Sequence, residues 1–70
     1  MKIGIIDLGT NTFNLLIVDA QKDKPFQSLV STKRAVMLGS DGLDKGFISD
    51  AALDRAFTVL SDFRVLIDQH

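Results

Sequence analysis

The stretch KIGIIDLGTNTFNLLIVDA, residues 2–20, places two apolar runs on either side of a short polar turn. Residues 2–8 are apolar and β-branched, which predicts a buried strand. Residues 13–20 predict a second strand with apolar side chains on both faces, so both faces should be covered in the folded protein. Residues 9–12 between them are turn formers. The stretch therefore predicts an antiparallel β-hairpin.

A third strand and a helix are expected beyond this hairpin. A polar turn at residues 21–25 leads into residues 26–36, which are more polar and predict a strand nearer the sheet edge. Three strands joined by short turns make an antiparallel meander. Residues 38–47 are rich in glycine and predict a loop, and Ser49 then suits the N-cap of a helix. The expected apolar face of that helix consists of Leu53, Phe57, Leu60, Phe63 and Ile67.

Composition excludes several classes of protein. Seventy residues make one small domain at most, and the absence of cysteine excludes disulfides and thiolate metal sites. Eight basic and nine acidic residues give a net charge of −1, which argues against nucleic-acid and membrane partners. The apolar stretch near the N-terminus is too short and interrupted for a signal peptide or a membrane span. We therefore expect a soluble, cytoplasmic protein.

The predicted elements carry more apolar surface than they can cover. A helix packed on a three-stranded sheet covers only one face of that sheet, whereas the strands are apolar on both. We therefore expect either a fragment of a larger α/β domain or self-association, for instance as a homodimer, through the uncovered sheet face.

The turn at residues 9–12 also has the chemistry of a phosphate-binding loop. Such a loop needs inward-pointing backbone N–H groups, glycine where the backbone approaches the ligand, and hydroxyl donors, and Gly9, Thr10, Asn11 and Thr12 supply these. Asp7, at the end of the preceding strand, suits Mg²⁺ or its bound water. The alternative is a plain hairpin turn with a solvated Asp7, because turns favour the same residues. An acid that interrupts an apolar run favours binding, since its burial is costly.

Two segments of the sequence resemble a known family. IGIIDLGTNTFNLLIVD is similar to the first phosphate loop of the actin-like ATPase superfamily, and its Asn-Thr-Phe-Asn continuation resembles the exopolyphosphatase/guanosine pentaphosphate phosphohydrolase (Ppx/GppA) family. That family usually has Asp-x-Gly-Ser-Asn-Ser, and Thr10 and Thr12 keep both hydroxyls. KRAVMLGSDGLDKGFIS, residues 33–49, resembles a second segment of the family. The implied fold is α/β: residues 1–70 form the N-terminal part of the first ribonuclease H-like/actin-like ATPase domain, with the rest of that domain and the second domain absent.

The resemblance implies roles for particular residues. Asp7 would lie near Mg²⁺, and Gly9, Thr10, Asn11 and Thr12 would bind phosphate. Arg34 would be the catalytic arginine that contacts substrate phosphates, a role that suits the permanently charged, two-pronged guanidinium. Without the resemblance, Arg34 would be interpreted as a surface charge at the end of a strand. Three further residues have weaker claims. Lys33 either adds positive potential to the site or is merely a solvated charge on the strand. Asp41 and Asp44 either line the substrate cleft or form turns.

The implied activity is hydrolysis of a terminal phosphoanhydride bond, with release of orthophosphate from polyphosphate or guanosine pentaphosphate. Members of the family use a glutamate as general base, and this chain contains none. The 70 residues alone are therefore expected to be inactive. Two alternatives stay open. One is another actin-like ATPase or kinase, and the other is a non-catalytic module for phosphate binding or oligomerisation.

Overall fold

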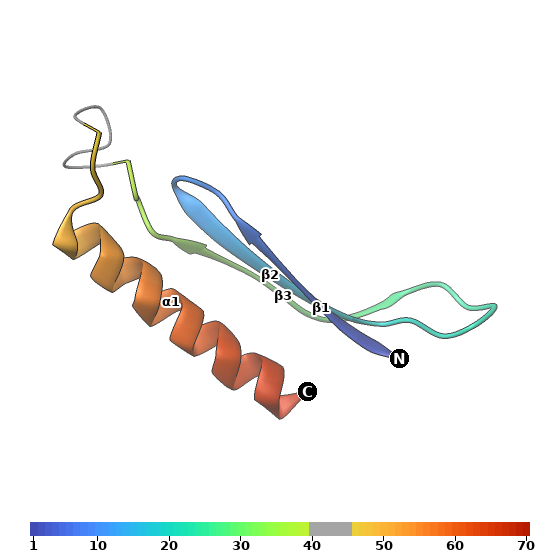
Figure 1. Cartoon of the computed structure of the whole chain (residues 1–70). Helices are drawn as coiled ribbons and strands as arrows, with labels where there is room; N and C mark the ends of the chain where they lie inside the picture. The colour runs from blue at the N-terminus through green and yellow to red at the C-terminus, as the bar shows by residue number, and fades with distance from the viewer. Residues whose placement is uncertain (40–45) are drawn as a thin grey trace.

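The computed structural model describes residues 1–39 and 46–70 and shows two layers, a sheet and a helix (Figure 1). The strands are β1 (Lys2–Leu8), β2 (Thr12–Asp19) and β3 (Gln27–Ala35), and the helix is α1 (Asp50–Gln69). The sheet order is β1-β2-β3, with both neighbouring pairs antiparallel. The predicted meander followed by a helix is therefore confirmed.

The strand register fixes which side chains share a face of the sheet. Leu8 pairs with Phe13 and Phe13 pairs with Arg34, so these three residues lie on one face. Asp7, Asn14 and Lys33 are paired in the same way and lie on the other face. One irregularity interrupts the β2–β3 register, between Ile17 and Val18. We call the face that carries Leu8, Phe13 and Arg34 the helix-side face and the other the open face.

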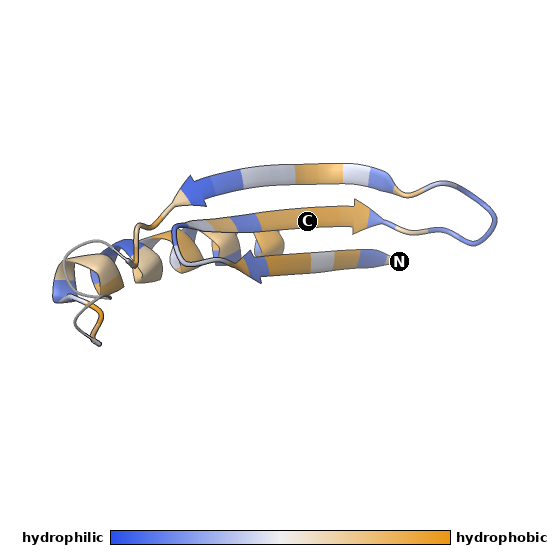
Figure 2. Ribbon diagram, turned by 90° about the horizontal axis from the view of Figure 1, so that it is seen from above, coloured by the Kyte–Doolittle hydropathy of each residue, from blue (hydrophilic) through white to orange (hydrophobic). Residues whose placement is uncertain are grey.

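The core lies between the helix-side face and α1, which packs chiefly against β2. Leu15, Val36 and Phe63 are the largest fully buried side chains. The buried cluster consists of Phe13, Leu15, Ile17, Val36, Ala56, Val59 and Phe63. Most of β2 is hydrophobic, whereas β3 is hydrophilic at both ends, in keeping with its position at a sheet edge (Figure 2).

The apolar face of α1 differs from the predicted one. Ser49 is the N-cap as predicted, and its Oγ accepts a hydrogen bond from the Ala52 amide at 3.1 Å. The buried helix residues are Ala52, Ala56, Val59 and Phe63, so the predicted stripe was wrong except at Phe63 and the partly buried Leu60. Phe57 remains 62% exposed. Small alanines allow a close approach of helix and sheet, which explains why that face packs instead.

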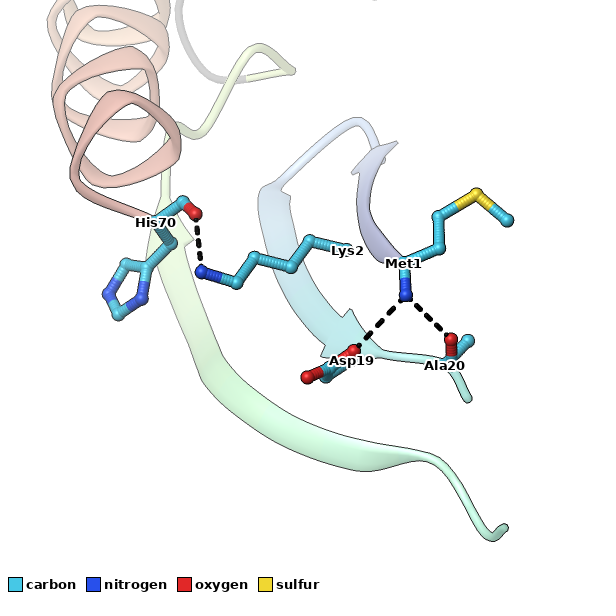
Figure 3. A network of polar contacts seen from close by, with 5 residues as sticks. All are labelled: Met1, Lys2, Asp19, Ala20 and His70. Carbon is cyan, nitrogen blue, oxygen red and sulfur yellow. Dashed lines mark hydrogen bonds and ion pairs between the residues drawn. The ribbon is translucent and has the colours of Figure 1, made fainter. Parts of the chain in front are cut away.

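β1 is less buried than its composition predicts. Its side chains Ile5, Ile6 and Leu8 are 49%, 42% and 59% exposed, because β1 is an edge strand. Ile5 lies on the open face, which has no layer over it, whereas Ile6 and Leu8 lie on the helix-side face, where α1 packs chiefly against β2. The beginning of β1 is tied to its neighbours: the Met1 amino group donates to Ala20 O at 2.8 Å, and Lys2 Nζ donates to the backbone oxygen of His70 at 2.9 Å (Figure 3).

No helix in the described part of the chain is long and apolar enough to cross a membrane.

Candidate functional site

The predicted phosphate loop is a tight connection between β1 and β2. The Gly9 amide donates to the Thr12 carbonyl at 3.0 Å, which closes the turn. A Cβ atom on Gly9 would lie 2.8 Å from that same carbonyl oxygen, closer than real Cβ contacts come. Glycine is therefore required here by the closeness of the backbone, in agreement with the sequence-based interpretation.

The segment that follows β3 holds the loop in place. The Asn11 carbonyl accepts hydrogen bonds from the amides of Val36 at 2.8 Å and Met37 at 3.1 Å. The Thr10 carbonyl accepts one from the Leu38 amide at 2.9 Å. Both loop carbonyls are thus directed towards residues 36–38, and the loop conformation depends on this long-range contact.

These contacts determine where the loop amides point. The described peptide bonds are all trans, so each N–H points away from the carbonyl of its own peptide unit. The amides of Asn11 and Thr12 share peptide units with the fixed carbonyls and are therefore directed away from residues 36–38. Within residues 1–39 and 46–70, the amides of Thr10 and Asn11 donate to no acceptor. Such N–H groups, with the adjacent hydroxyls, can form an anion-binding concavity.

Arg55 of α1 supports the loop through residues 36 and 37. Its Nε donates to the Val36 carbonyl at 2.9 Å, and a terminal nitrogen donates to the Met37 carbonyl at 3.0 Å. Met37 has φ 51°, a left-handed conformation that is uncommon for residues other than glycine. Arg55 is not part of the apolar helix face expected from the sequence. Its spacing from Ala52 and Val59 would have placed it on the buried face, had the alanines been recognised as packing residues.

Asp7 lies on the open face, beside the loop and paired with Asn14. Its side chain is exposed, so it can reach a metal ion in solvent. The described residues contain no group of three or more His, Cys, Asp or Glu side chains that could hold a metal. Because Mg²⁺ is often held by one or two carboxylates together with water and substrate phosphates, a lone carboxylate fits it only when phosphate is bound as well.

Arg34 lies on the opposite face of the sheet from Asp7. Its guanidinium contacts the Asp62 carboxylate of α1 at 2.8 Å, with both side chains about half exposed. The structure thus brings Asp7 and the loop to one end of the sheet but places Arg34 on the helix side. The catalytic role of Arg34 stays a prediction. Asp41 and Asp44, the two other acids named from the sequence, lie outside the described residues.

Two open pockets lie near the loop end of the sheet. The first, about 260 Å³ in volume, lies between β3 and α1 and is lined by Arg34, Ala35, Asp54, Arg55, Thr58 and Val59. The second, about 280 Å³ in volume, is mostly apolar and is lined by Leu8, Gly9, Thr10, Phe13, Leu38 and Ile48. Apolar walls do not stabilise a phosphate, so the second pocket does not suit a phosphate group.

Comparison with known proteins shows close similarity to exopolyphosphatases. A crystal structure of an exopolyphosphatase from Cytophaga hutchinsonii is 51% identical to the chain and superposes with a TM-score of 0.93; the match covers 100% of this chain and 22% of that one. Exopolyphosphatase 1 from Mycobacterium bovis and from Mycobacterium leprae are each 30% identical over 63 residues, which is 90% of this chain and 18% and 19% of theirs. No model of a known protein family matches the sequence. The chain spans about a fifth of the length of these relatives.

Proposed function

Because this chain belongs to the Ppx/GppA family and has part of the actin-like ATPase fold, we propose that it is the phosphate-binding part of a phosphoanhydride hydrolase. The proposed reaction releases orthophosphate from polyphosphate or from guanosine pentaphosphate. The loop Gly9–Thr12 binds the phosphate to be transferred. The proposed site of action is the cytoplasm.

One observation carries this proposal: two loop carbonyls accept hydrogen bonds, while two loop amides donate none to the described residues. The carbonyls of Thr10 and Asn11 accept hydrogen bonds from residues 36–38, and the amides of Thr10 and Asn11 donate to no described acceptor. An ordinary hairpin turn needs no such tether from a third strand. The Asn11 amide shares its peptide unit with the tethered Thr10 carbonyl, so the tether holds this open N–H on the opposite side of the loop. A donor fixed in this way is preorganised for a phosphate oxygen.

Asp7 is the proposed magnesium ligand. Its exposed carboxylate lies at the end of β1, next to the loop and on the open face. When bound, Mg²⁺ neutralises charge on the phosphate oxygens and orients them. The chain's own contribution would be to hold the ion's ligand and the phosphate donors on one hairpin, so that the ion and the loop amides could act on the same phosphate group.

Arg34 is the proposed second contact to the substrate phosphates. Its guanidinium is paired with Asp62 at 2.8 Å, and this pair is half exposed, so its net contribution to stability is small. A polyanionic substrate offers a stronger partner than a single carboxylate. Arg34 would therefore exchange Asp62 for phosphate when substrate binds.

The general base must come from outside these residues if it is a glutamate, because the chain contains none. A phosphate-binding loop without a base positions a phosphate but does not activate water. We therefore expect the 70-residue chain alone to bind phosphate without turnover.

The test is a graft into a complete enzyme. This chain replaces the matching 22% of the Cytophaga hutchinsonii exopolyphosphatase, and orthophosphate release is measured with Mg²⁺ on polyphosphate, guanosine pentaphosphate and ATP. We expect release by the graft, none by the chain alone, and a loss of about tenfold or more for Asp7→Asn, since tenfold is only about 1.4 kcal/mol of transition-state stabilisation. Asp23→Asn, in the distant β2–β3 turn, is the matched control.

Other outcomes would contradict the proposal in distinct ways. Release from ATP alone would favour another actin-like ATPase or kinase. Equal activity of the Asp7→Asn and Asp23→Asn grafts would mean that Asp7 is not a metal ligand. A graft that folds and releases orthophosphate from none of the three substrates would leave the hairpin with a structural role.

A further inference from the structure

A row of three polar side chains crosses the open face next to the phosphate loop. Asp7 of β1 pairs with Asn14 of β2, and Asn14 pairs with Lys33 of β3. Directly paired residues of antiparallel strands point to the same face, with Cβ atoms about 5 Å apart. The row therefore runs across the whole width of the sheet, about 10 Å from β1 to β3. The next row towards the far end, Ile5–Leu16–Ser31, is apolar on β1 and β2.

Lys33 differs from the other cations near the loop in having no partner among the described residues. Arg34 is paired with Asp62, and Arg55 contacts the carbonyls of Val36 and Met37. The Lys33 ammonium group forms no hydrogen bond or ion pair with any residue in 1–39 or 46–70. Its side chain is exposed and on the face of Asp7, so its ammonium group is available to an anion bound there.

We propose that Lys33, together with the Asn14 amide, forms a second phosphate subsite that receives the phosphate groups following the one held by the loop. The ligand is a linear chain of phosphates, whose path runs from the loop and Asp7 across Asn14 to Lys33. This inference rests on the proposed function of the loop, and it concerns contacts on the open face, whereas Arg34 lies on the helix-side face.

The chemistry of the row matches a polyanion better than a single phosphate. The lysine ammonium is a flexible point charge with three donors, so it can follow phosphate oxygens along a chain without demanding one geometry. The Asn14 amide offers N–H₂ donors between the two charged ends. Orthophosphate held at the loop has no group that extends towards β3. Lys33 should therefore contribute to the binding of tripolyphosphate and not to that of orthophosphate.

The test compares two ligands on matched lysine variants. Binding of tripolyphosphate and of orthophosphate to the 70-residue chain is measured by calorimetry in Mg²⁺, for the unchanged chain, Lys33→Met, Lys33→Arg and Lys24→Met. Lys24 is an exposed lysine in the β2–β3 turn, at the opposite end of the sheet, and serves as the control. Methionine keeps an apolar stem of similar length, so the variants should keep the fold. NMR spectra of the backbone amides verify that each variant keeps the fold.

We expect Lys33→Met to weaken tripolyphosphate binding by about tenfold, the size of one charge-assisted contact, and to leave orthophosphate binding unchanged. Lys33→Arg should restore most of the affinity, and Lys24→Met should have no effect. Equal affinities for tripolyphosphate in the Lys33→Met and unchanged chains would overturn the subsite while the loop assignment stands. Failure of the folded, unchanged chain to bind either ligand would overturn both proposals.

Discussion

The guanidinium of Arg55 donates a hydrogen bond to the Val36 carbonyl at 2.9 Å, which ties α1 to the segment that tethers the phosphate loop. The Val36 amide donates in turn to the Asn11 carbonyl at 2.8 Å. Helix, strand end and loop are thus connected through one continuous set of hydrogen bonds. The loop conformation therefore depends on a helix residue that does not contact the proposed ligand.

Replacing Arg55 by Met should loosen the loop. The variant loses two hydrogen bonds from a charged donor to backbone carbonyls, and we expect the free energy of unfolding to fall by about 1–3 kcal/mol. Amide exchange at Leu38, which donates to Thr10, should become faster. Urea unfolding and hydrogen exchange measure the two effects.

The matched control for Arg55 is Arg64→Met. Arg64 is 84% exposed and forms a weak ion pair with Asp68 at 3.9 Å, so its loss should change stability by less than about 0.5 kcal/mol. Equal stability losses in the two variants, or Leu38 exchange that is unchanged in Arg55→Met, would contradict the tether.

Two glycine substitutions should have opposite consequences. Gly9→Ala places a Cβ atom 2.8 Å from the Thr12 carbonyl oxygen, so the turn must open, and we expect a loss of about 1–3 kcal/mol. Gly4→Ala meets no atom within 4 Å and removes backbone freedom from the unfolded chain, so stability should stay the same or rise by up to about 1 kcal/mol. Thermal unfolding of both variants gives the comparison. A Gly9→Ala chain as stable as Gly4→Ala would disprove the tight turn.

The buried face of α1 can be checked with two phenylalanines. Phe63 is fully buried, and Phe63→Ala should destabilise the chain by about 3–5 kcal/mol, enough to unfold so small a domain. Phe57 is 62% exposed, and Phe57→Ala should cost far less. Far-ultraviolet circular dichroism at increasing urea distinguishes them. A loss for Phe57→Ala as large as that for Phe63→Ala would mean that the stripe expected from the sequence, which contains both residues, is the one that packs.

The open face should drive self-association of the isolated chain. Ile5 is 49% exposed and pairs with Leu16, so apolar surface is continuous over two strands there. We propose that a homodimer covers this surface, and that Ile5→Lys returns the chain to a monomer in sedimentation velocity. Ser31→Lys, in the same row on β3, is the control. An unchanged chain that stays monomeric at high concentration would contradict this proposal.

The hairpin, the third strand and the helix start could all be predicted from the sequence, because local signals specify them. Apolar runs alternate with turn residues, and Ser49 caps the helix as its side chain suggests. The buried stripe of α1 could not be predicted in the same way. Two apolar faces lie side by side on this helix, and the choice of the alanine face depends on how closely it approaches β2.

The candidate site was predictable only in part. Asp7 and the loop are contiguous in sequence, so their proximity follows from the hairpin alone. The face on which Arg34 and Lys33 lie depends on the β2–β3 register, where a shift of one residue exchanges the two. The contacts of Arg55 with Val36 and Met37 depend on helix docking, and no local pattern indicates them.

The central claim is that the loop binds phosphate through its own amides, and amide chemical shifts test it most directly. A ¹⁵N-labelled chain is titrated with inorganic pyrophosphate in Mg²⁺, and shifts at Thr10 and Asn11 are compared with those at Lys22 and Lys24 in the distant turn. We predict saturable shifts of the loop amides, lost in Gly9→Ala, with no comparable change in the turn. Shifts confined to the lysine-containing turn, or no shifts at all, would contradict a phosphate-binding loop.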